Sequence, residues 1–144
     1  MSTDDAIRAM LLLLPRMMGR LKRVSQPQAL DDFALAPRHR SLLSYLVFDG
    51  PLGVNELAQR LEVAPATVSL MVSDLSRQGV LERQEDPNDR RRAIVSIAPA
   101  HREAIEEWLA GFAHAWRVAF DPLTAEQRQL FVDTLQTYAR EIGD

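Results

Sequence analysis

The stretch that most constrains the fold is VNELAQRLEVAPATVSLMVSDLSRQG, residues 54–79, which predicts two short helices around a tight turn. Asn55 is a suitable N-cap for the first helix, whose inward residues are Leu57, Ala58 and Leu61. Val63 and Ala64 form the turn, and Pro65 suits the first position of the second helix, where a missing N–H costs nothing. Gly79 can adopt the left-handed conformation that ends this second helix, whose inward residues are Val68, Met71, Val72 and Leu75. Two helices joined by so short a turn form a helix-turn-helix.

The outward face of the second helix differs from that of an ordinary surface helix. It carries small, hydroxyl and apolar side chains with one cation, namely Ala66, Thr67, Ser69, Leu70, Ser73 and Arg77. Small residues allow close approach to another surface, hydroxyl groups can bind phosphates or base edges, and a leucine can contact a thymine methyl group. The face favours a DNA-recognition helix, and a plain solvated helix is the alternative.

A β-hairpin is predicted directly after the helix-turn-helix. VLERQ, residues 80–84, and RAIVSI, residues 92–97, are β-rich runs with partial alternation. EDPNDRR between them is rich in residues that form turns. A hairpin in this position is a wing, and its tip gathers Asp86, Asp89, Arg90, Arg91 and Arg92 in a chain whose net charge is −3.

Long helices are predicted on both sides of this motif. Apolar residues at three- and four-residue steps predict a helix over residues 4–24, which Pro15 should kink or interrupt near Leu14. Residues 25–37 are a linker, and a helix from Arg38 to Asp49 follows, with Leu42, Leu43, Leu46 and Val47 inward. A helix from Pro99 to about Ala119 and a last helix capped by Thr124 and Gln127 complete the chain. The fold class is therefore mainly α with a small β-hairpin wing.

The charges are distributed unevenly along the 144 residues. Residues 38–98 hold eight basic and eight acidic side chains, whereas residues 99–144 hold four and eight. Nearly all of the negative excess lies in the last third, which favours a solvated acidic face there. A local basic face elsewhere is compatible with the net charge, so binding to nucleic acid is not excluded.

Enzyme activity and metal binding are not indicated. The absence of cysteine excludes disulfides, thiolate catalysis and cysteine-based zinc sites, and there is no Ser/His/Asp spacing or Gly-rich phosphate loop. The three histidines are scattered, so no cofactor or metal is predicted, with a His–carboxylate metal site as the alternative. The longest apolar run, AMLLLLP at residues 9–15, is too short to span a membrane or to favour a signal peptide. A cytoplasmic protein without a membrane partner is expected.

The chain resembles the MarR family of winged helix-turn-helix transcriptional regulators. The resemblance rests on APRHRSLLSYL, followed by GVNELAQRLEVAPATVSLMVSDLSRQGVLERQEDPNDRRRAIVSIAP. It implies one MarR-like domain over residues 1–144, with a winged helix-turn-helix at 37–99 and dimerisation helices at 4–24 and 100–144. It further implies a homodimer that binds double-stranded DNA at a pseudo-palindrome and represses transcription. A small, often phenolic or aromatic, ligand would release the DNA.

The resemblance also assigns roles to individual residues. The recognition helix, which would enter the major groove, contributes Pro65, Ala66, Thr67, Ser69, Leu70, Ser73 and Arg77. The wing would enter the minor groove with Arg91 oriented by Asp89, while Arg90 and Arg92 point either to phosphates or back to the protein. His39 is a weak candidate for ligand binding. Leu70 and Ala64 depart from the polar residues common in the family at these positions, which leaves the target sequence open.

Two other functions remain as alternatives. A winged-helix module can bind protein without any DNA role, or it can bind DNA architecturally without an inducer. The salt dependence of binding distinguishes a DNA-binding module from a protein-binding one, because each neutralised phosphate steepens the loss of affinity with salt.

Overall fold

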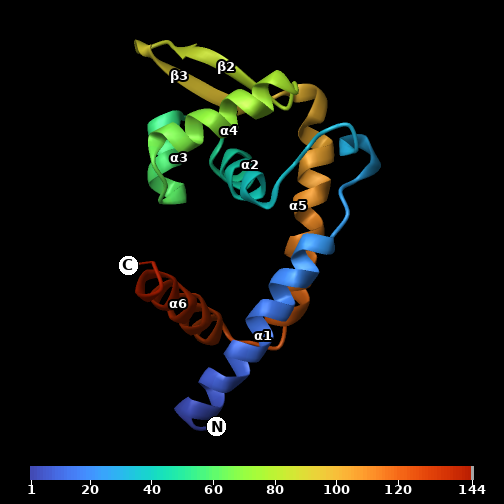
Figure 1. The fold of residues 1–144 in the computed structure, drawn as a ribbon, viewed down its shortest axis with the longest axis vertical. Helices are drawn as coiled ribbons and strands as arrows, with labels where there is room; N and C mark the ends of the chain where they lie inside the picture. Colours follow the sequence, from blue (N-terminus) through green and yellow to red (C-terminus); the bar gives the residue numbers. More distant parts are fainter. Residues whose placement is uncertain (144) are drawn as a thin grey trace. The chain divides into compact units, whose positions relative to one another are not determined.

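The computed structural model describes residues 1–143, and the chain forms two compact units, Met1–Trp108 and Leu109–Asp144. The first unit contains α1 (Thr3–Arg23), a short 3-10 helix η1 (Gln28–Leu30), α2 (Pro37–Asp49), β1 (Leu52–Gly53), α3 (Val54–Leu61), α4 (Pro65–Arg77), β2 (Leu81–Asp86) and β3 (Asp89–Ile97). Helix α5 (Pro99–Phe120) begins in the first unit, and its second half belongs to the second unit together with α6 (Ala125–Glu141) (Figure 1).

The core of the first unit lies among α2, α3, α4 and the sheet. Its fully or almost fully buried residues include Leu42, Leu43, Leu46, Leu57, Val68, Val72, Leu75, Val80 and Val95. Burying each such side chain contributes about 1.5–3 kcal/mol, so this cluster fixes the positions of the helices relative to the sheet. The predicted inward faces are confirmed, except that Val47 and Leu61 are partly exposed. Leu30 is also fully buried, although the sequence predicted only a linker there.

The turn between α3 and α4 has the predicted position, and Pro65 begins α4 as predicted. Glu62 adopts a left-handed conformation with φ of 55°, and this residue reverses the chain after α3. Ala64 directly precedes Pro65. The prediction that Asn55 caps α3 is wrong: β1 leads directly into the helix, so Gly53 is the N-cap and Asn55 lies within the first turn.

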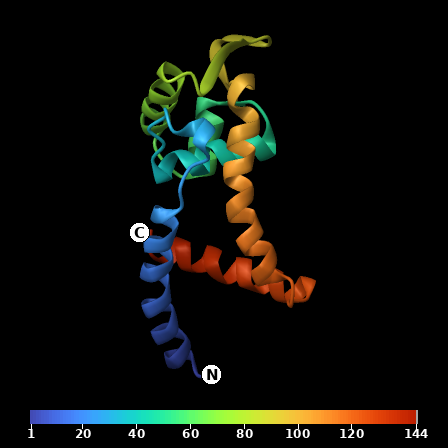
Figure 2. The same cartoon turned by 90° about the vertical axis from the view of Figure 1, so that its right-hand side faces the viewer.

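The sheet has three antiparallel strands in the order β1-β3-β2. The β2–β3 hairpin is longer than predicted, because both strands continue through most of EDPNDRR and leave only Pro87 and Asn88 as the turn. The register shifts near the tip, because Glu85 is paired with Ala93 whereas Asp86 is paired with Asp89. Strand β1 was not predicted, and it pairs Leu52 with Val95 and Gly53 with Ile94. Figure 2 shows the hairpin projecting beyond the helices of the first unit.

Helices α1 and α6 contain no buried residue. Helix α1 continues through Pro15, so of the two predicted effects of this residue a break near Leu14 is wrong, whereas a kink stays a prediction. The predicted cap of α6 is confirmed, since the Gln127 backbone N–H donates to Thr124 Oγ1 at 3.2 Å and the Thr124 N–H donates to Gln127 Oε1 at 2.9 Å. None of the helices in residues 1–143 has a stretch sufficiently long and apolar to cross a membrane.

Candidate nucleic-acid interface

The outward face of α4 is open to solvent. Pro65, Ala66, Thr67, Ser69, Leu70 and Arg77 are exposed, and Ser73 is partly exposed. Leu70 is the extreme case, because 73% of its surface is accessible although its side chain is apolar. The opposite face holds Val68, Met71, Val72 and Leu75 against the core, so α4 is held firmly while its small residues stay accessible.

A hydrogen bond connects strand β2 to this face. Arg83 Nη2 donates to Ser73 Oγ at 2.8 Å. Residues 81 and 83 share one face of β2, because side chains alternate along a strand. Leu81 therefore packs into the core, and Arg83, one step further along the strand, reaches α4 beyond the edge of the core.

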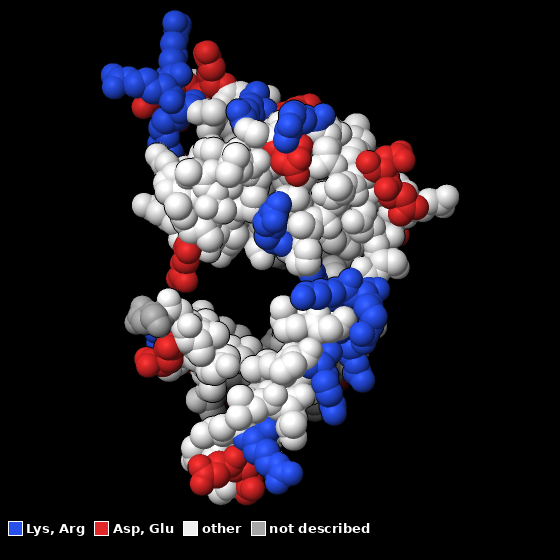
Figure 3. All heavy atoms as spheres, viewed as in Figure 1, with Lys and Arg blue, Asp and Glu red and all other residues white. Residues whose placement is uncertain are grey.

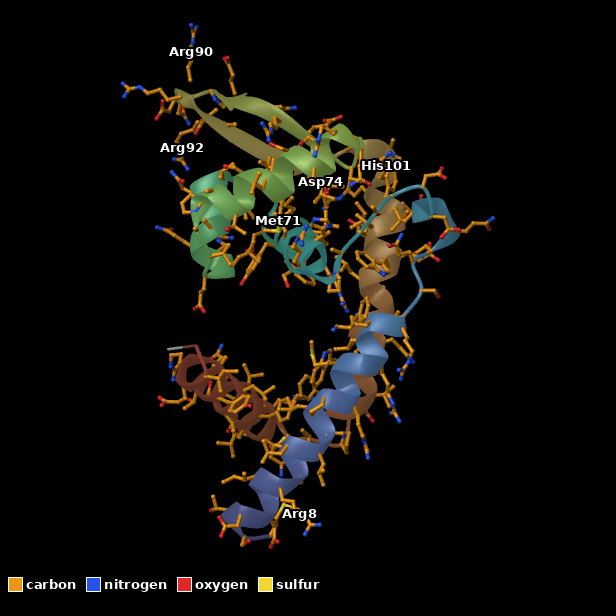
Figure 4. The ribbon with its side chains drawn as sticks, viewed as in Figure 1. Arg8, Met71, Asp74, Arg90, Arg92 and His101 are labelled. Carbon is orange, nitrogen blue, oxygen red and sulfur yellow. The ribbon has the colours of Figure 1, made fainter. Side chains whose placement is uncertain are left out.

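The arginines of the wing tip differ in their contacts. Asp89 Oδ1 accepts a hydrogen bond from the backbone N–H of Arg91 at 3.0 Å, so the carboxylate holds the chain rather than the guanidinium. Arg90 extends away from the end of the hairpin (Figure 4). Within residues 1–143, neither Arg90 nor Arg91 forms an ion pair with a carboxylate.

Arg92 points back to the protein. Its guanidinium forms an ion pair with Glu56 of α3. Gly53 makes room for this contact, since a Cβ atom at that position would lie only 3.1 Å from Arg92 Nη2. Of the two orientations that the sequence left open for Arg92, the structure has the one toward the protein.

A shallow hollow of about 250 Å³ lies on the hairpin, and four arginines line it: Arg83 from β2, and Arg90, Arg91 and Arg92 from β3. Glu85 is the acidic residue of its lining. Figure 3 shows basic side chains gathered at the end of the hairpin. The two strands of the hairpin hold four arginines and four acidic residues, so the positive charge is local to the hollow and is not a net charge of the hairpin.

The end of α4 that is remote from Pro65 is held by the segment before α2. The backbone N–H of Ala34 donates to Gln78 Oε1 at 2.8 Å, and Gln78 Nε2 donates to Asp74 Oδ2 at 3.4 Å. Asp74 Oδ2 lies 3.9 Å from His39 Nε2 of α2. These contacts fix the direction in which α4 presents its open face.

His39 lies at the junction between the linker and α2, where the sequence placed it. It is 1% exposed, and its Nδ1 accepts a hydrogen bond from the Ala36 N–H at 3.0 Å, so the neutral ring carries its proton on Nε2. Burial, together with the nearby charge of Arg38, lowers the pKa of His39 below its usual value, and Asp74 opposes this only in part. The ring is therefore neutral at pH 7. In residues 1–143, no three His, Asp or Glu side chains are grouped as ligands for a metal ion.

Sequence reasoning located both the helix face and the wing tip, but it missed residues that hold them in place. Arg83, Glu56 and Gln78 were not singled out, although each forms a hydrogen bond between two elements: Arg83 with α4, Glu56 with β3, and Gln78 with the segment before α2. The signal for Arg83 was present, because alternation puts residues 81 and 83 on the same face. No local pattern reveals Glu56 or Gln78, since their partners are fixed only by the folded chain.

A short helix, a tight turn, an open helix of small residues and an arginine-tipped hairpin define the winged helix-turn-helix class of DNA-binding proteins. Residues 35–92 match the family model described as MarR family. This segment of the chain is therefore similar to MarR-family transcriptional regulators.

Known proteins similar to this chain are also regulators. The HTH-type transcriptional repressor MdtR of Bacillus subtilis is 33% identical over 89 residues, which is 60% of this chain and 57% of MdtR. The matched part of the chain thus spans little more than half of that relative. The PcaV regulator of Streptomyces coelicolor, solved with its natural ligand, superposes with a TM-score of 0.63 at 21% identity over 89% of both chains. The S. aureus MepR–DNA complex gives a TM-score of 0.65 at 22% identity, covering 91% of this chain and 96% of MepR. These two structures support the fold.

Proposed function

We propose that the protein is a homodimeric, sequence-specific repressor that binds a pseudo-palindromic site on double-stranded DNA and leaves it when a small ligand binds. The observation that carries the proposal is the pairing of two features in one unit: the open face of α4 and the arginine-tipped wing. The first fits a major groove and the second a minor groove. The solved complex of MepR with DNA supports this use of the fold.

The chemistry of α4 favours a direct reading of bases. Thr67, Ser69 and Ser73 offer hydroxyl groups to phosphates or base edges, and Leu70 offers an apolar surface to a thymine methyl group. Pro65 and Ala66 at the beginning of the helix allow close approach to the sugar-phosphate backbone. Arg77, near the other end of α4, is exposed and suits a phosphate.

The chemistry of the wing favours the minor groove. Arg90 and Arg91 are exposed and form no ion pair within residues 1–143, so DNA binding breaks no contact with a carboxylate. Asp89 fixes the backbone of Arg91 beforehand, which reduces the entropy lost on binding. Arg92 keeps the wing in place through Glu56 and is expected to contribute to DNA binding mainly in this way.

A homodimer is supported by the apolar surfaces that this chain leaves uncovered. On α1, Leu11 is 65% exposed and Leu12 is 59% exposed, and on α6 Leu130 is 67% exposed. The second unit also has an apolar hollow of about 780 Å³, lined by Trp116, Phe120 and Phe131 among others. Surfaces of this kind mark an interaction site, and a second copy of the chain is the proposed occupant.

Release by a small ligand is supported by the ligand-bound structure of PcaV. His39 remains the candidate residue in this chain, since its Nε2 is buried and has no hydrogen-bond partner in residues 1–143. A ligand that offered an acceptor to Nε2 would change the contacts around Asp74, and hence the support of α4. The role of His39 is tested by comparing release from DNA by a panel of phenolic acids in the wild type and in His39→Gln.

The DNA-binding proposal is tested by selecting duplexes from a randomised 24-bp pool and measuring affinity between 50 and 300 mM salt. A repressor of the proposed kind enriches a pseudo-palindrome with half-sites about 10 bp apart. Its log affinity falls with log salt by about 0.9 per phosphate contact. A protein-binding module would enrich no sequence and show no such slope, and an architectural binder would show the slope without a sequence.

A further inference from the structure

Arg83 lies outside the wing tip, yet it connects the two parts of the proposed interface. It is exposed on β2, and its guanidinium donates to Ser73 Oγ on the open face of α4 at 2.8 Å. It forms no ion pair in residues 1–143, so this hydrogen bond is the contact that holds it. A guanidinium has five N–H donors, and four of these are left for other partners.

This hydrogen bond determines whether the Ser73 hydroxyl can act as a donor or as an acceptor toward a ligand. A hydroxyl group has one proton to donate and two lone pairs to accept with. Arg83 occupies a lone pair, and its positive charge repels any further donor, so the oxygen becomes a poor acceptor and a stronger donor. Within residues 1–143, the Ser73 hydroxyl has no acceptor for its proton. The partly buried Ser44 of α2 differs, because its hydroxyl donates to the carbonyl of Arg40 at 2.7 Å. The Ser73 proton is thus available to a ligand.

The position of Arg83 also suits a phosphate. It lines the hollow of about 250 Å³ on the hairpin together with Arg90 and Arg91. The charge of this hollow favours an anion, and the hollow lies on the strands that link α4 with the wing tip. A DNA strand that passes from the major to the minor groove places its phosphates between these two elements.

We propose that Arg83 is a specificity-determining residue, which holds the Ser73 hydroxyl as a donor to a base acceptor and binds a backbone phosphate with its remaining N–H groups. The base read by Ser73 is then one that offers an acceptor in the major groove, such as guanine N7 or O6, adenine N7 or thymine O4. Cytosine, which offers an amino donor, is disfavoured there. This inference rests on the proposed DNA-binding function.

The test uses the full chain and the duplex that the wild type selects from the randomised 24-bp pool. Arg83→Ala, Ser73→Ala and the double variant are compared by fluorescence anisotropy, with Arg102→Ala on α5 as a control that removes a cation outside the interface. At one position in each half-site, the wild type should disfavour cytosine by about tenfold. Each single variant should reduce this discrimination to less than about threefold. The double variant should reduce it no further, because all three variants lose the same contact of Ser73 with the base.

The salt slope separates the two roles of Arg83. Arg83→Ala and Arg83→Gln should each lower the slope by about 0.9 per half-site, because one phosphate contact is lost, whereas Ser73→Ala and Arg102→Ala should leave it unchanged. Arg83→Gln keeps an N–H donor without the charge and should retain more of the base discrimination than Arg83→Ala. Circular dichroism checks that each variant is folded.

Three outcomes would overturn the inference. If Ser73→Ala keeps the full discrimination against cytosine, Ser73 does not read this base. If Arg83→Ala keeps both the discrimination and the salt slope while the wild type binds specifically, Arg83 has neither role and the proposed function still stands. If the wild type itself selects no sequence and shows no salt dependence, the proposed function fails, and the inference fails with it.

Discussion

The three consecutive arginines of the wing have different surroundings. Arg92 is paired with Glu56, whereas Arg90 and Arg91 form no ion pair within residues 1–143. Arg91 is distinguished from Arg90 by the hydrogen bond from its backbone N–H to Asp89. One residue thus anchors the hairpin, while its neighbours are left for a ligand, and substitutions at these positions should have separate effects.

Arg91→Ala should weaken binding to the selected duplex about tenfold or more, because a positioned guanidinium is lost from the minor groove. The side chain is exposed, so the midpoint of thermal unfolding should not change. Gel-shift titration measures the affinity, and Arg102→Ala is the control for loss of a positive charge. An unchanged affinity in Arg91→Ala would falsify the assignment of the wing tip.

Asp89→Ala should also weaken binding, by about three- to tenfold, because the hydrogen bond to the Arg91 backbone is lost. Simple electrostatics predicts the opposite sign, since a negative charge is removed near DNA. Glu85→Ala is the matched control: it removes a charge from the same hairpin, and binding should stay equal or become tighter. Tighter binding by both variants would show that Asp89 acts only through its charge.

His39 should make stability depend on pH in a defined direction. Its pKa is lowered in the folded protein, so the unfolded chain takes up the proton first as the pH falls. Its contribution is complete above the unfolded value of about 6.5 and is lost as the pH falls from there through the lower folded pKa. Denaturant unfolding at pH 7.5 and 5.0 should show a smaller loss in His39→Gln than in the wild type. His114→Gln is the control, because His114 is exposed, and this variant should lose as much stability as the wild type. An equal loss in the wild type and His39→Gln would contradict the prediction.

At the scale of elements, α2, α4 and α5 could be predicted to within about two residues, because each has a strong apolar period and a recognisable end. Strand β1 could not be predicted, since two residues become a strand only by pairing with Val95 and Ile94. Pro15 is a different case, because the sequence around a proline favours the end of a helix, yet α1 continues through this residue. The faces of the candidate interface followed from periodicity, whereas the partners of Arg83 and Arg92 required the fold.

Gly79 ends α4 with φ of 83°, so a side chain there should cost stability even though no atom would meet an added Cβ. Gly79→Ala should lower the free energy of unfolding by about 1 kcal/mol through backbone strain alone. Gly111→Ala is the matched control, because it lies within α5 with open space around it and should raise helix stability by about as much. The two changes are compared by denaturant unfolding, and an equal effect of both would exclude the conformational explanation.

At the scale of the whole molecule, the apolar surface is concentrated on elements outside the winged helix-turn-helix. Helices α1 and α6 expose leucines, and both lack buried residues. The acidic excess also lies in residues 99–144, away from the arginines of the wing in the sequence. The proposed self-association and the proposed DNA binding therefore use different parts of the chain, so single substitutions should separate them.

The wild type should have the mass of a dimer in light scattering at micromolar concentration. Leu11→Glu, on the apolar face of α1, should shift this mass toward the monomer, because a charge is placed in the proposed contact. Leu70→Glu is the control, since Leu70 is 73% exposed on α4 and should affect DNA binding without changing the mass. A monomeric wild type, or a fully dimeric Leu11→Glu, would contradict the proposed use of α1.

The order β1-β3-β2 has a consequence for solubility. Strand β2 lies at the edge of the sheet, and an uncovered edge is a template on which other chains can add strands and aggregate. A wing that enters DNA, as proposed for this hairpin, cannot be covered by a helix, so its protection has to come from its own side chains. Glu82, Arg83 and Glu85 supply charges along that edge, and Pro87, which cannot donate a hydrogen bond, stands directly after it. The same composition that suits the hairpin to nucleic acid therefore also keeps it from polymerising.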